Sequence, residues 1–379
     1  AVYFRDITRD ISAEEELVEA RDKAVEGEKA KAHFIAIMSH EMRTPLNGIL
    51  GMTGLLLDSG LDANQKAYAD AIRESGTALL ALINDILDYS KIDAGKIDLE
   101  ETVFDPLSLV QSVTELLSPR AAHKGLEIAS YVDPSVPQRL IGDEARLRQV
   151  LLNLAGNGVK FTEDGGVTIE VNTEECQAGV AHIRIDVRDS GVGISGQDLP
   201  LIFDEFAQAD STHARKFEGT GLGLAIARRI VQAMGGTMTA ESTLGEGSTF
   251  SFSVPLKIAT GRNNTRKEYK ISDPVIMITT SDTLKRIVTL QLQTARVKNF
   301  CITSSPEETF SFLRKHRNAI LLCDLAFAAQ YGEKLAKAAS HALVLLSPVA
   351  RGRLESFRRV GFQGYLIKPM RQSSLFERL

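Results

Sequence analysis

The sequence predicts a multi-domain chain in which a helical hairpin is followed by two α/β domains. Three observations point to this fold class. Apolar residues recur at helical spacing in the first quarter, short apolar runs alternate with helical segments in the rest, and a polar linker at residues 259–272 divides that rest in two. With 379 residues, 44% of them apolar and 25% charged, the chain has ordinary globular composition and room for two to four domains.

The first predicted domain is the hairpin over residues 33–95, preceded by the end of an upstream sensory domain at residues 1–10 and a signalling helix at residues 11–32. Both hairpin helices carry apolar residues that step by three and four, which is typical of a packed coiled-coil stripe. One hairpin buries only one face, so the remaining apolar surface predicts a homodimeric four-helix bundle. The stripe residues are Ile35, Met38, Met42, Pro45, Ile49, Met52 and Leu56 on the first helix and Tyr68, Ile72, Ser75, Leu79, Leu82 and Ile86 on the second.

One histidine of the first helix lies outside this stripe. If Ile35 occupies position a of the heptad, His40 falls at f and Thr44 at c, so both are expected to face solvent. Pro45 removes a backbone amide, and its ring presses on the carbonyl of Glu41, which predicts a bend beside the histidine. The sequence therefore places an accessible imidazole next to a carboxylate.

The second predicted domain, residues 96–258, is an α/β sandwich, because short apolar runs alternate with helical segments. Strands are expected at residues 97–104, 126–132, 167–171, 182–189 and 249–254, and helices at residues 106–124, 143–157 and 223–234.

A glycine-rich loop precedes the last of these helices and consists of Gly219, Thr220, Gly221, Leu222 and Gly223. Glycines let backbone amides approach an anion, and the helix N-terminus favours negative charge, so the loop is suited to phosphate. It is not the dinucleotide-binding fingerprint, because an isoleucine stands where the third glycine would be.

Two further groups strengthen the case for a nucleotide site. Asp189 ends a predicted strand and offers an acceptor for a purine amino group, with Gly191 and Gly193 in the loop that follows. Three polar residues lie at i, i+4 and i+7 of one predicted helix: Asn153, Asn157 and Lys160. Amide oxygens can ligate Mg²⁺, which makes Asn157 the candidate metal ligand, and the lysine can reach phosphate. Each group alone also fits a capped turn or a polar helix face, whereas all three in order favour a bound nucleotide.

These segments resemble the motifs of bacterial sensor histidine kinases. The resemblance covers nearly all of residues 33–255 and rests on six ordered segments: residues 39–45, 153–162, 189–193, 203–206, 219–223 and 244–250. It implies a dimerisation and phosphotransfer hairpin, followed by an ATP-binding sandwich of the kind shared with gyrase and Hsp90-type ATPases, with ATP and Mg²⁺ as cofactors.

The resemblance also implies roles for the residues around the histidine. His40 is expected to be the nucleophile that attacks the γ-phosphate, while Glu41 orients or deprotonates the second ring nitrogen. Thr44, on the same face, could position water for hydrolysis of a phosphorylated partner, which would be a phosphatase activity. The polar segment between Phe203 and the glycine loop is interpreted as a mobile lid over ATP, with Arg215 and Lys216 as phosphate contacts; a merely flexible loop is the competing interpretation.

The third predicted domain, residues 273–379, is doubly wound, with strands expected at residues 275–279, 319–323, 342–346 and 364–367. It resembles a response-regulator receiver, since Asp324 stands where the phosphoacceptor would be and Lys368 matches the lysine of the lysine-proline corner. The first strand, however, is followed by Thr279 and Thr280 in place of an acidic pair, so metal and phosphoryl charge would be poorly stabilised. We interpret this domain as a pseudo-receiver, with an ordinary phosphorylated receiver as the alternative.

The charge of the chain is unevenly distributed. From residue 261 onward there are 20 basic against 9 acidic residues, and before it 24 against 40, so a basic domain follows an acidic body. This predicts an anionic ligand or a clamp on the acidic body. The hypothesis for the ligand is cyclic di-GMP, as in some hybrid kinases of similar build, bound through guanidinium groups and flat apolar surfaces. The expected ligand residues are Arg351, Arg353, Tyr365, Ile367, Pro369 and Arg371.

Composition excludes several other classes. Three widely separated cysteines without metal-ligand spacing predict no disulfide. No apolar run approaches the roughly 20 residues needed to cross a bilayer, and the first residues lack the features of a signal peptide, so we expect a cytoplasmic chain without a transmembrane segment. No nucleic-acid partner is expected. The main prediction is a histidine kinase that passes phosphate to an aspartate of a receiver; the alternatives are a nucleotide-binding signalling scaffold without phosphotransfer and a gyrase-like ATPase motor.

Overall fold

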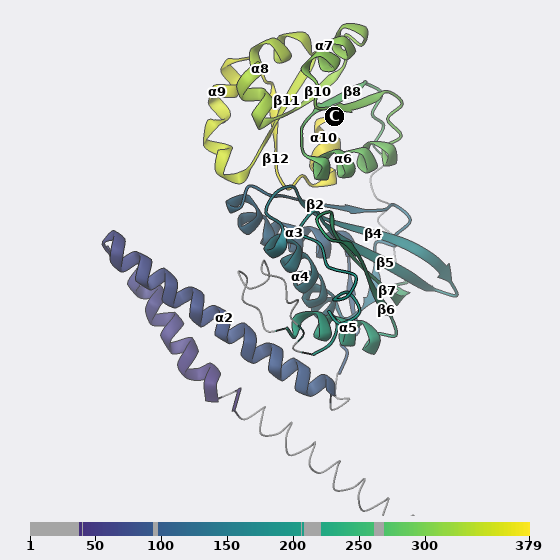
Figure 1. Cartoon of the computed structure of the whole chain (residues 1–379). Coiled ribbons are helices and arrows are strands. Elements are labelled where there is room, and N and C mark those ends of the chain that lie inside the picture. The colour runs from purple at the N-terminus through teal and green to yellow at the C-terminus, as the bar shows by residue number, and fades with distance from the viewer. Residues whose placement is uncertain (1–37, 40, 94–97, 206, 208–220, 261–268) are drawn as a thin grey trace, which may run out of the picture. The chain divides into compact units, whose positions relative to one another are not determined.

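The computed structural model describes residues 38–39, 41–93, 98–205, 207, 221–260 and 269–379 (Figure 1). The chain divides into two compact units. One contains the described part of residues 1–98 together with residues 221–226, and the other contains the remaining described residues. Within the described residues, no helix combines the length and the apolar composition that crossing a bilayer would need. The three cysteines are unpaired, as predicted.

The hairpin consists of a helix over residues 41–57 and the helix α2, Ala63–Asp93. The two helices meet through buried Leu46, Ala69 and Ile83. At Gly76 a Cβ atom would lie 2.8 Å from Leu50 Cδ2, so the helices approach closely there. The first helix continues through Pro45.

The two apolar stripes predicted from spacing are not the surfaces that join the helices of one chain. Exposed large apolar residues include Met38, Met42, Ile49, Met52 and Leu56 on the first helix and Tyr68, Ile72, Leu79 and Ile86 on α2. A helix in a four-helix bundle has two neighbours, and the intrachain neighbour is contacted through other residues. The expectation that these stripes are packed is therefore wrong for the single chain, whereas the expectation that a second apolar surface remains is confirmed.

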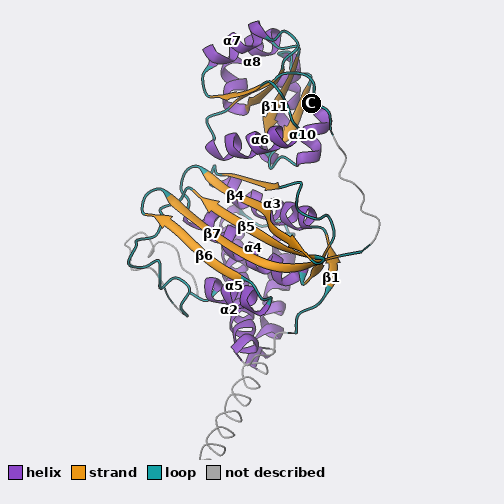
Figure 2. Cartoon of the chain, turned by 90° about the vertical axis from the view of Figure 1, so that its right-hand side faces the viewer, coloured by secondary structure: helices purple, strands orange, loops and turns teal. Residues whose placement is uncertain are grey.

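The middle domain is built on a seven-stranded mixed sheet in the order β1-β3-β7-β5-β4-β2, with β6 paired to β7. The helices α3, α4 and α5 cover one face of this sheet, as Figures 1 and 2 show. The bounds are β1 Thr102–Phe104, α3 Pro106–His123, β2 Glu127–Val132, β3 Leu140–Gly142, α4 Glu144–Phe161, β4 Gly166–Gln177, β5 Val180–Asp189, α5 Gly223–Ala233, β6 Thr237–Thr243 and β7 Gly247–Ile258.

The predicted elements of this domain differ from the observed ones mainly at their ends. Of the strand expected at residues 97–104, the described part, residues 98–104, is a strand only at Thr102–Phe104, and α4 continues four residues beyond the predicted end at Asn157. Strands β3 and β6 were missed because β3 has three residues and β6 alternates between exposed and half-buried positions, so neither contains an apolar run.

The C-terminal domain has a five-stranded parallel sheet in the order β12-β11-β10-β8-β9, the doubly wound arrangement that the sequence predicts. The missed strand is β9, Phe300–Thr303, in which three of four residues are only half-buried. The other elements are β8 Val275–Ile278, α6 Asp282–Thr294, α7 Pro306–Lys315, β10 Ile320–Asp324, α8 Leu325–Ala338, β11 His341–Leu346, a 3₁₀ helix Pro348–Arg353, α9 Leu354–Arg359, β12 Gly364–Ile367 and α10 Gln372–Arg378.

Candidate functional site

The helix α4 carries the predicted asparagine and lysine residues. Its N-terminus is capped by Asp143, whose side chain accepts a hydrogen bond from the Arg146 backbone amide at 2.9 Å. One face of the helix is buried in the domain core, while Asn153, Asn157 and Lys160 are half-buried on the other. Burial lowers the pKa of Lys160, and the nearby positive charge of Arg120 lowers it further. The structure thus brings the three predicted residues together on one helix face.

A lysine that the sequence analysis did not single out holds the C-terminal end of α4. Lys124 Nζ donates hydrogen bonds to the backbone carbonyls of Val159 at 2.8 Å, Lys160 at 2.7 Å and Thr162 at 3.3 Å. Partial burial lowers the pKa of this lysine. A cation at a helix C-terminus satisfies otherwise unpaired carbonyls and complements the helix dipole. No local sequence signal marks this role, because the lysine lies 35 to 38 residues before the carbonyls it binds.

Asp189 is the last residue of β5 and is 9% exposed. Its Oδ1 accepts hydrogen bonds from the backbone amides of Gly191 at 2.9 Å and Ser248 at 3.3 Å. Burial raises the pKa of Asp189, and the two backbone hydrogen bonds oppose that rise. The carboxylate is thus held in a fixed orientation by the loop that follows its strand.

A small polar cradle lies beside this carboxylate. A Cβ atom at Gly191 would lie 2.7 Å from the Phe161 carbonyl oxygen, 2.9 Å from Asp189 Oδ1 and 3.0 Å from Thr162 Oγ1. Thr162 is fully buried, and its hydroxyl has no hydrogen-bond partner among the described residues. Such an orphaned group is costly unless a ligand or water satisfies it. Thr162 is the last residue of the segment 153–162 that carries the family resemblance, and it was not predicted to belong to the site.

The glycines around this cradle have roles in the fold. At Gly158 a Cβ would lie 3.0 Å from Val167 and 3.4 Å from the Asp189 Cβ, so this glycine lets α4 pack against β4 and β5. Helix packing therefore accounts for Gly158, whereas Gly156 has open space around its Cβ position. Gly193 has φ of +69°, and a Cβ there would meet the Thr243 carbonyl oxygen at 2.0 Å.

The segment that leads toward the predicted lid is anchored to the sandwich. Phe203 packs edge-on against Phe250 with a centroid distance of 6.5 Å, and the Arg228 guanidinium lies 5.3 Å from the Phe203 ring centroid. Glu205 forms an ion pair with Arg229 at 2.7 Å. The lid residues Arg215 and Lys216, like Gly219 and Thr220, lie outside the described residues.

The described end of the glycine loop leads directly into α5. Gly221 has φ of +69°, Leu222 is buried, and Gly223 is the first residue of the helix. The expectation that the loop precedes a helix N-terminus is therefore confirmed for these three residues.

The described neighbours of the predicted nucleophile lie at the start of the first hairpin helix. His40 itself falls outside the described residues. Thr44 is exposed, as predicted, and Glu41 is exposed as well. Between them, Arg43 donates a 3.0 Å hydrogen bond to Asn84 Oδ1 and so links the two helices.

The predicted ligand residues of the C-terminal domain lie on neighbouring elements. Arg351 and Arg353 belong to the 3₁₀ helix after β11, and Tyr365 and Ile367 lie on β12, which pairs with β11. Pro369 follows β12, and its peptide bond with Lys368 is cis. The Arg371 guanidinium is already engaged, because it donates to both carboxylate oxygens of Glu115 on α3 at 2.5 and 2.8 Å.

Two domain families match the first two thirds of the chain. Residues 30–95 match the His Kinase A (phospho-acceptor) domain, and residues 142–258 match the histidine kinase-, DNA gyrase B- and HSP90-like ATPase.

Several characterised proteins are similar to this chain. AruS of Pseudomonas aeruginosa is 33% identical over 94% of this chain and 37% of its own length, and GacS of Pseudomonas protegens is 44% identical over 64% of this chain and 26% of its own length. BarA of Escherichia coli K12 is 41% identical over 64% of this chain and 26% of its own length. The crystal structure of full-length ShkA in complex with AMPPNP superposes with a TM-score of 0.76 at 37% identity, covering 91% of this chain and 70% of that one.

The chain spans between 13% and 37% of the length of the curated relatives it matches. The matched domain families and relatives show that the chain belongs to the sensor histidine kinase family.

Proposed function

We propose that this chain is an ATP-dependent protein-histidine kinase that phosphorylates its own His40. The observation that supports this most directly is the cradle around Gly191, where an oriented carboxylate and a buried hydroxyl without a partner among the described residues lie so close to the backbone that no side chain would fit. Asp189 can accept a hydrogen bond from an adenine amino group, and the Thr162 hydroxyl can bond the same ring directly or through water. The relative ShkA was crystallised with the ATP analogue AMPPNP.

The remaining residues of α4 fit the phosphate end of the same nucleotide. Asn153 and Asn157 offer neutral oxygen ligands for Mg²⁺, which would neutralise phosphate charge when bound. Lys160 lies one turn further along the same face and supplies a cation for the phosphates. From the glycine loop, Gly219, Thr220, Gly221, Leu222 and Gly223 supply backbone amides for phosphate, and Arg215 and Lys216 of the lid supply further cations.

The reaction follows from these assignments. The unprotonated imidazole nitrogen of His40 attacks the γ-phosphorus, a nitrogen–phosphorus bond forms, and the bond to the β–γ bridging oxygen breaks, so that ADP leaves with that electron pair. Glu41 orients the imidazole and holds its second N–H, which stabilises the positive charge that develops on the ring. The phosphoryl group then passes to an aspartate of a receiver, and Thr44 positions water when the reaction runs as a phosphatase.

The exposed apolar stripes of the hairpin support a homodimer, since a phospho-acceptor hairpin with two uncovered apolar surfaces is half of a four-helix bundle. We assign the hairpin to residues 33–95, the ATP-binding domain to residues 96–258 and the C-terminal domain to residues 273–379.

Incubation with γ-labelled ATP and Mg²⁺ tests the proposal. The expected product is acid-labile, alkali-stable label on the chain that disappears in His40→Ala. Nucleotide binding without such label would instead establish a signalling scaffold, and label-free ATP hydrolysis that persists in His40→Ala would establish an ATPase motor.

A finer proposal concerns the C-terminal domain, which we assign as a pseudo-receiver that binds cyclic di-GMP. Its support is the position of Arg371, whose guanidinium fork is held by Glu115 of the ATP-binding domain. A guanine edge or a phosphate needs the same fork, so the ligand would compete with this contact and release it. Calorimetric titration of the full chain should show binding that tightens in Glu115→Gln and is lost in Arg371→Ala; no heat at high micromolar ligand in any of the three proteins would end this proposal.

A further inference from the structure

The edge strand β2 carries a small apolar patch on the face of the sandwich sheet that the C-terminal domain covers. Along β2, Ile128 and Val132 are buried on one side of the strand, and Ala129 and Tyr131 are buried on the other. The second pair packs against Ile287 of α6. A strand that is apolar on both faces is covered on both faces, so β2 is built to receive a second domain.

Polar contacts surround this apolar patch. The hydroxyl groups of Tyr131 and Thr294 lie 2.7 Å apart. Arg286 of α6 donates to both carboxylate oxygens of Glu170 on β4, a residue that is only 7% exposed. A guanidinium group that donates two hydrogen bonds to one buried carboxylate makes a specific contact, because the carboxylate would be buried and unpaired without it.

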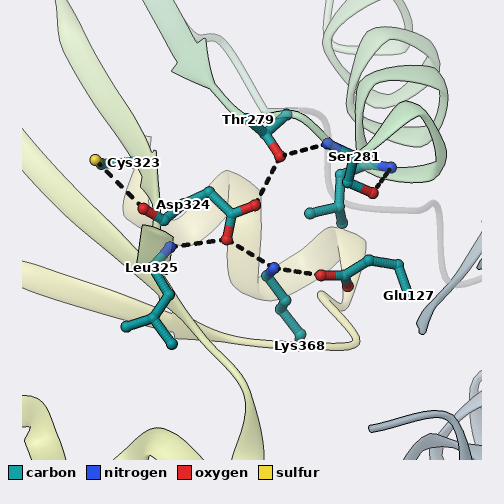
Figure 3. A network of polar contacts seen from close by, with 8 residues as sticks. Glu127, Thr279, Ser281, Cys323, Asp324, Leu325 and Lys368 are labelled. Carbon is teal, nitrogen blue, oxygen red and sulfur yellow. Dashed lines mark hydrogen bonds and ion pairs between the residues drawn. The ribbon is translucent and has the colours of Figure 1, made fainter. Parts of the chain in front are cut away.

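The third element of the interface is a lysine shared between the two domains, shown in Figure 3. Lys368 Nζ donates to Asp324 Oδ1 at 2.8 Å within its own domain and to Glu127 Oε1 of the sandwich at 2.5 Å. Its side chain is 11% exposed. Burial acts to lower the pKa of Lys368, but the charges of Glu127 and Asp324 outweigh it, and the pKa lies above its usual value.

Asp324 is enclosed by donors of its own domain. Besides Lys368, its Oδ1 accepts from the Leu325 backbone amide at 2.8 Å, and its Oδ2 accepts from the Thr279 hydroxyl at 2.7 Å. Thr279 is fully buried and in turn accepts from the Ser281 amide at 3.1 Å (Figure 3). Among the described residues, no cluster of three metal-ligating side chains lies here. Both carboxylate oxygens are therefore occupied by contacts that orient the group.

We propose that Asp324 is a positioning residue for domain docking: it fixes Lys368 so that the ammonium group binds Glu127 and holds the C-terminal domain on the outer face of the ATP-binding sandwich. The residues around Asp324, which resemble a phosphoacceptor site, thus supply one contact of an intramolecular interface. An anion that takes Lys368 away from Glu127 weakens the docked state, because the ammonium group cannot serve both partners in the same geometry.

The proposal concerns docking and goes beyond phosphotransfer, so its test uses neither ATP nor His40. The readout is oxidative footprinting of the full chain by mass spectrometry, with Tyr131 as the reporter because its ring lies between β2 and α6 and is 5% exposed. Alkylation of Cys323, fully buried in β10, separates undocking from unfolding of the C-terminal domain.

Asp324→Asn and Glu127→Gln should each raise the open population by at least about 30-fold, since truncating one partner of a buried charge pair has an effect of this order. Tyr131 oxidation then rises while Cys323 stays protected. The double variant should add little to either single one, because both remove the same contact. The matched control is Glu333→Gln, which removes an exposed ion pair with Lys337 elsewhere in the domain and should leave Tyr131 protected.

Two results would overturn the proposal. In the first, Asp324→Asn leaves Tyr131 protected while Glu127→Gln exposes it. In the second, acetyl phosphate and Mg²⁺ convert Asp324 to an acyl phosphate in the wild-type chain while Tyr131 remains protected, which would show that the corner accepts phosphate without any link to docking. These outcomes do not depend on whether His40 becomes phosphorylated, so a negative result in the histidine kinase assay would not change them.

Discussion

Replacement of Thr162 by valine should stabilise the free protein and weaken nucleotide binding at the same time. The hydroxyl is fully buried and unpartnered among the described residues, so the folded chain carries its desolvation cost without a compensating hydrogen bond. That cost is about 1–3 kcal/mol for a buried hydroxyl, and valine has nearly the same shape as threonine. Thr162→Val should therefore raise the free energy of unfolding by about 1 kcal/mol or more, which corresponds to roughly 2–4 °C in Tm for a domain of this size.

The same substitution removes a hydrogen-bonding group from the cradle around Asp189. Losing one hydrogen bond to a ligand weakens binding by about 0.5–1.5 kcal/mol, or roughly 2- to 13-fold in Kd. Thermal unfolding without nucleotide and calorimetric titration with AMPPNP measure the two effects separately. Thr162→Ser keeps the hydroxyl and should retain affinity.

Thr114 provides a matched control because it is also buried but donates to the Val110 carbonyl at 2.8 Å. Thr114→Val loses a satisfied hydrogen bond and should be destabilised by about 1 kcal/mol without a change in affinity. The reasoning fails if Thr162→Val behaves like Thr114→Val, with lower stability and unchanged nucleotide binding, because the hydroxyl would then be satisfied within the protein.

Three further predictions follow from the site and the hairpin. The raised pKa of Asp189 means that its ionised form is disfavoured in the folded chain. The free energy of unfolding should therefore fall as pH rises from the ordinary carboxyl pKa of about 3.9 through the raised pKa. Adenine affinity needs the carboxylate, so it should fall as pH drops through the raised pKa. Measurements of stability and of adenine affinity across acidic pH should show these two dependences in the wild type and not in Asp189→Asn. Equal pH profiles in the two proteins would contradict the prediction. Lys124→Met should remove three hydrogen bonds from the end of α4 and lower stability by about 1–2 kcal/mol, measured by denaturant unfolding, with Lys66→Met on the hairpin surface as the neutral control. Met52→Glu places a charge on the exposed hairpin stripe and should shift sedimentation toward the monomer, and an unchanged dimer would show that this stripe does not form the interface.

Local pattern was a reliable guide wherever one residue's environment depends on its near neighbours in sequence. The spacing of Asn153, Asn157 and Lys160 predicted their common face because helix geometry places residues four and three apart on one side. The end of β5 at Asp189 followed from strand alternation, and the doubly wound C-terminal sheet followed from four of its five strands. Strand β9 was missed because a half-buried four-residue strand carries too few apolar positions to be distinguished from a loop.

The stripe on the first hairpin helix shows a different limit. Its spacing correctly indicated an apolar surface, yet Met38, Met42 and Met52 are exposed in the single chain, while Leu46 contacts the second helix. Periodicity says that a face is apolar, and it does not say which neighbour covers it. The choice between an intrachain and an intersubunit partner depends on the rotation of each helix about its axis, which only packing decides.

The sequence by itself determined the order of the domains, the family, the elements that carry the motifs and the identity of the polar residues on α4 and at the end of β5. The tertiary structure alone decided that Lys124 holds the end of α4, that the Thr162 hydroxyl is left without a partner beside Asp189, and that Lys368 joins Asp324 to Glu127. The physical reason is the range of the interactions. Periodicity and capping arise between residues a few positions apart, whereas these contacts join residues tens to hundreds of positions apart, whose meeting depends on how the helices and sheets pack.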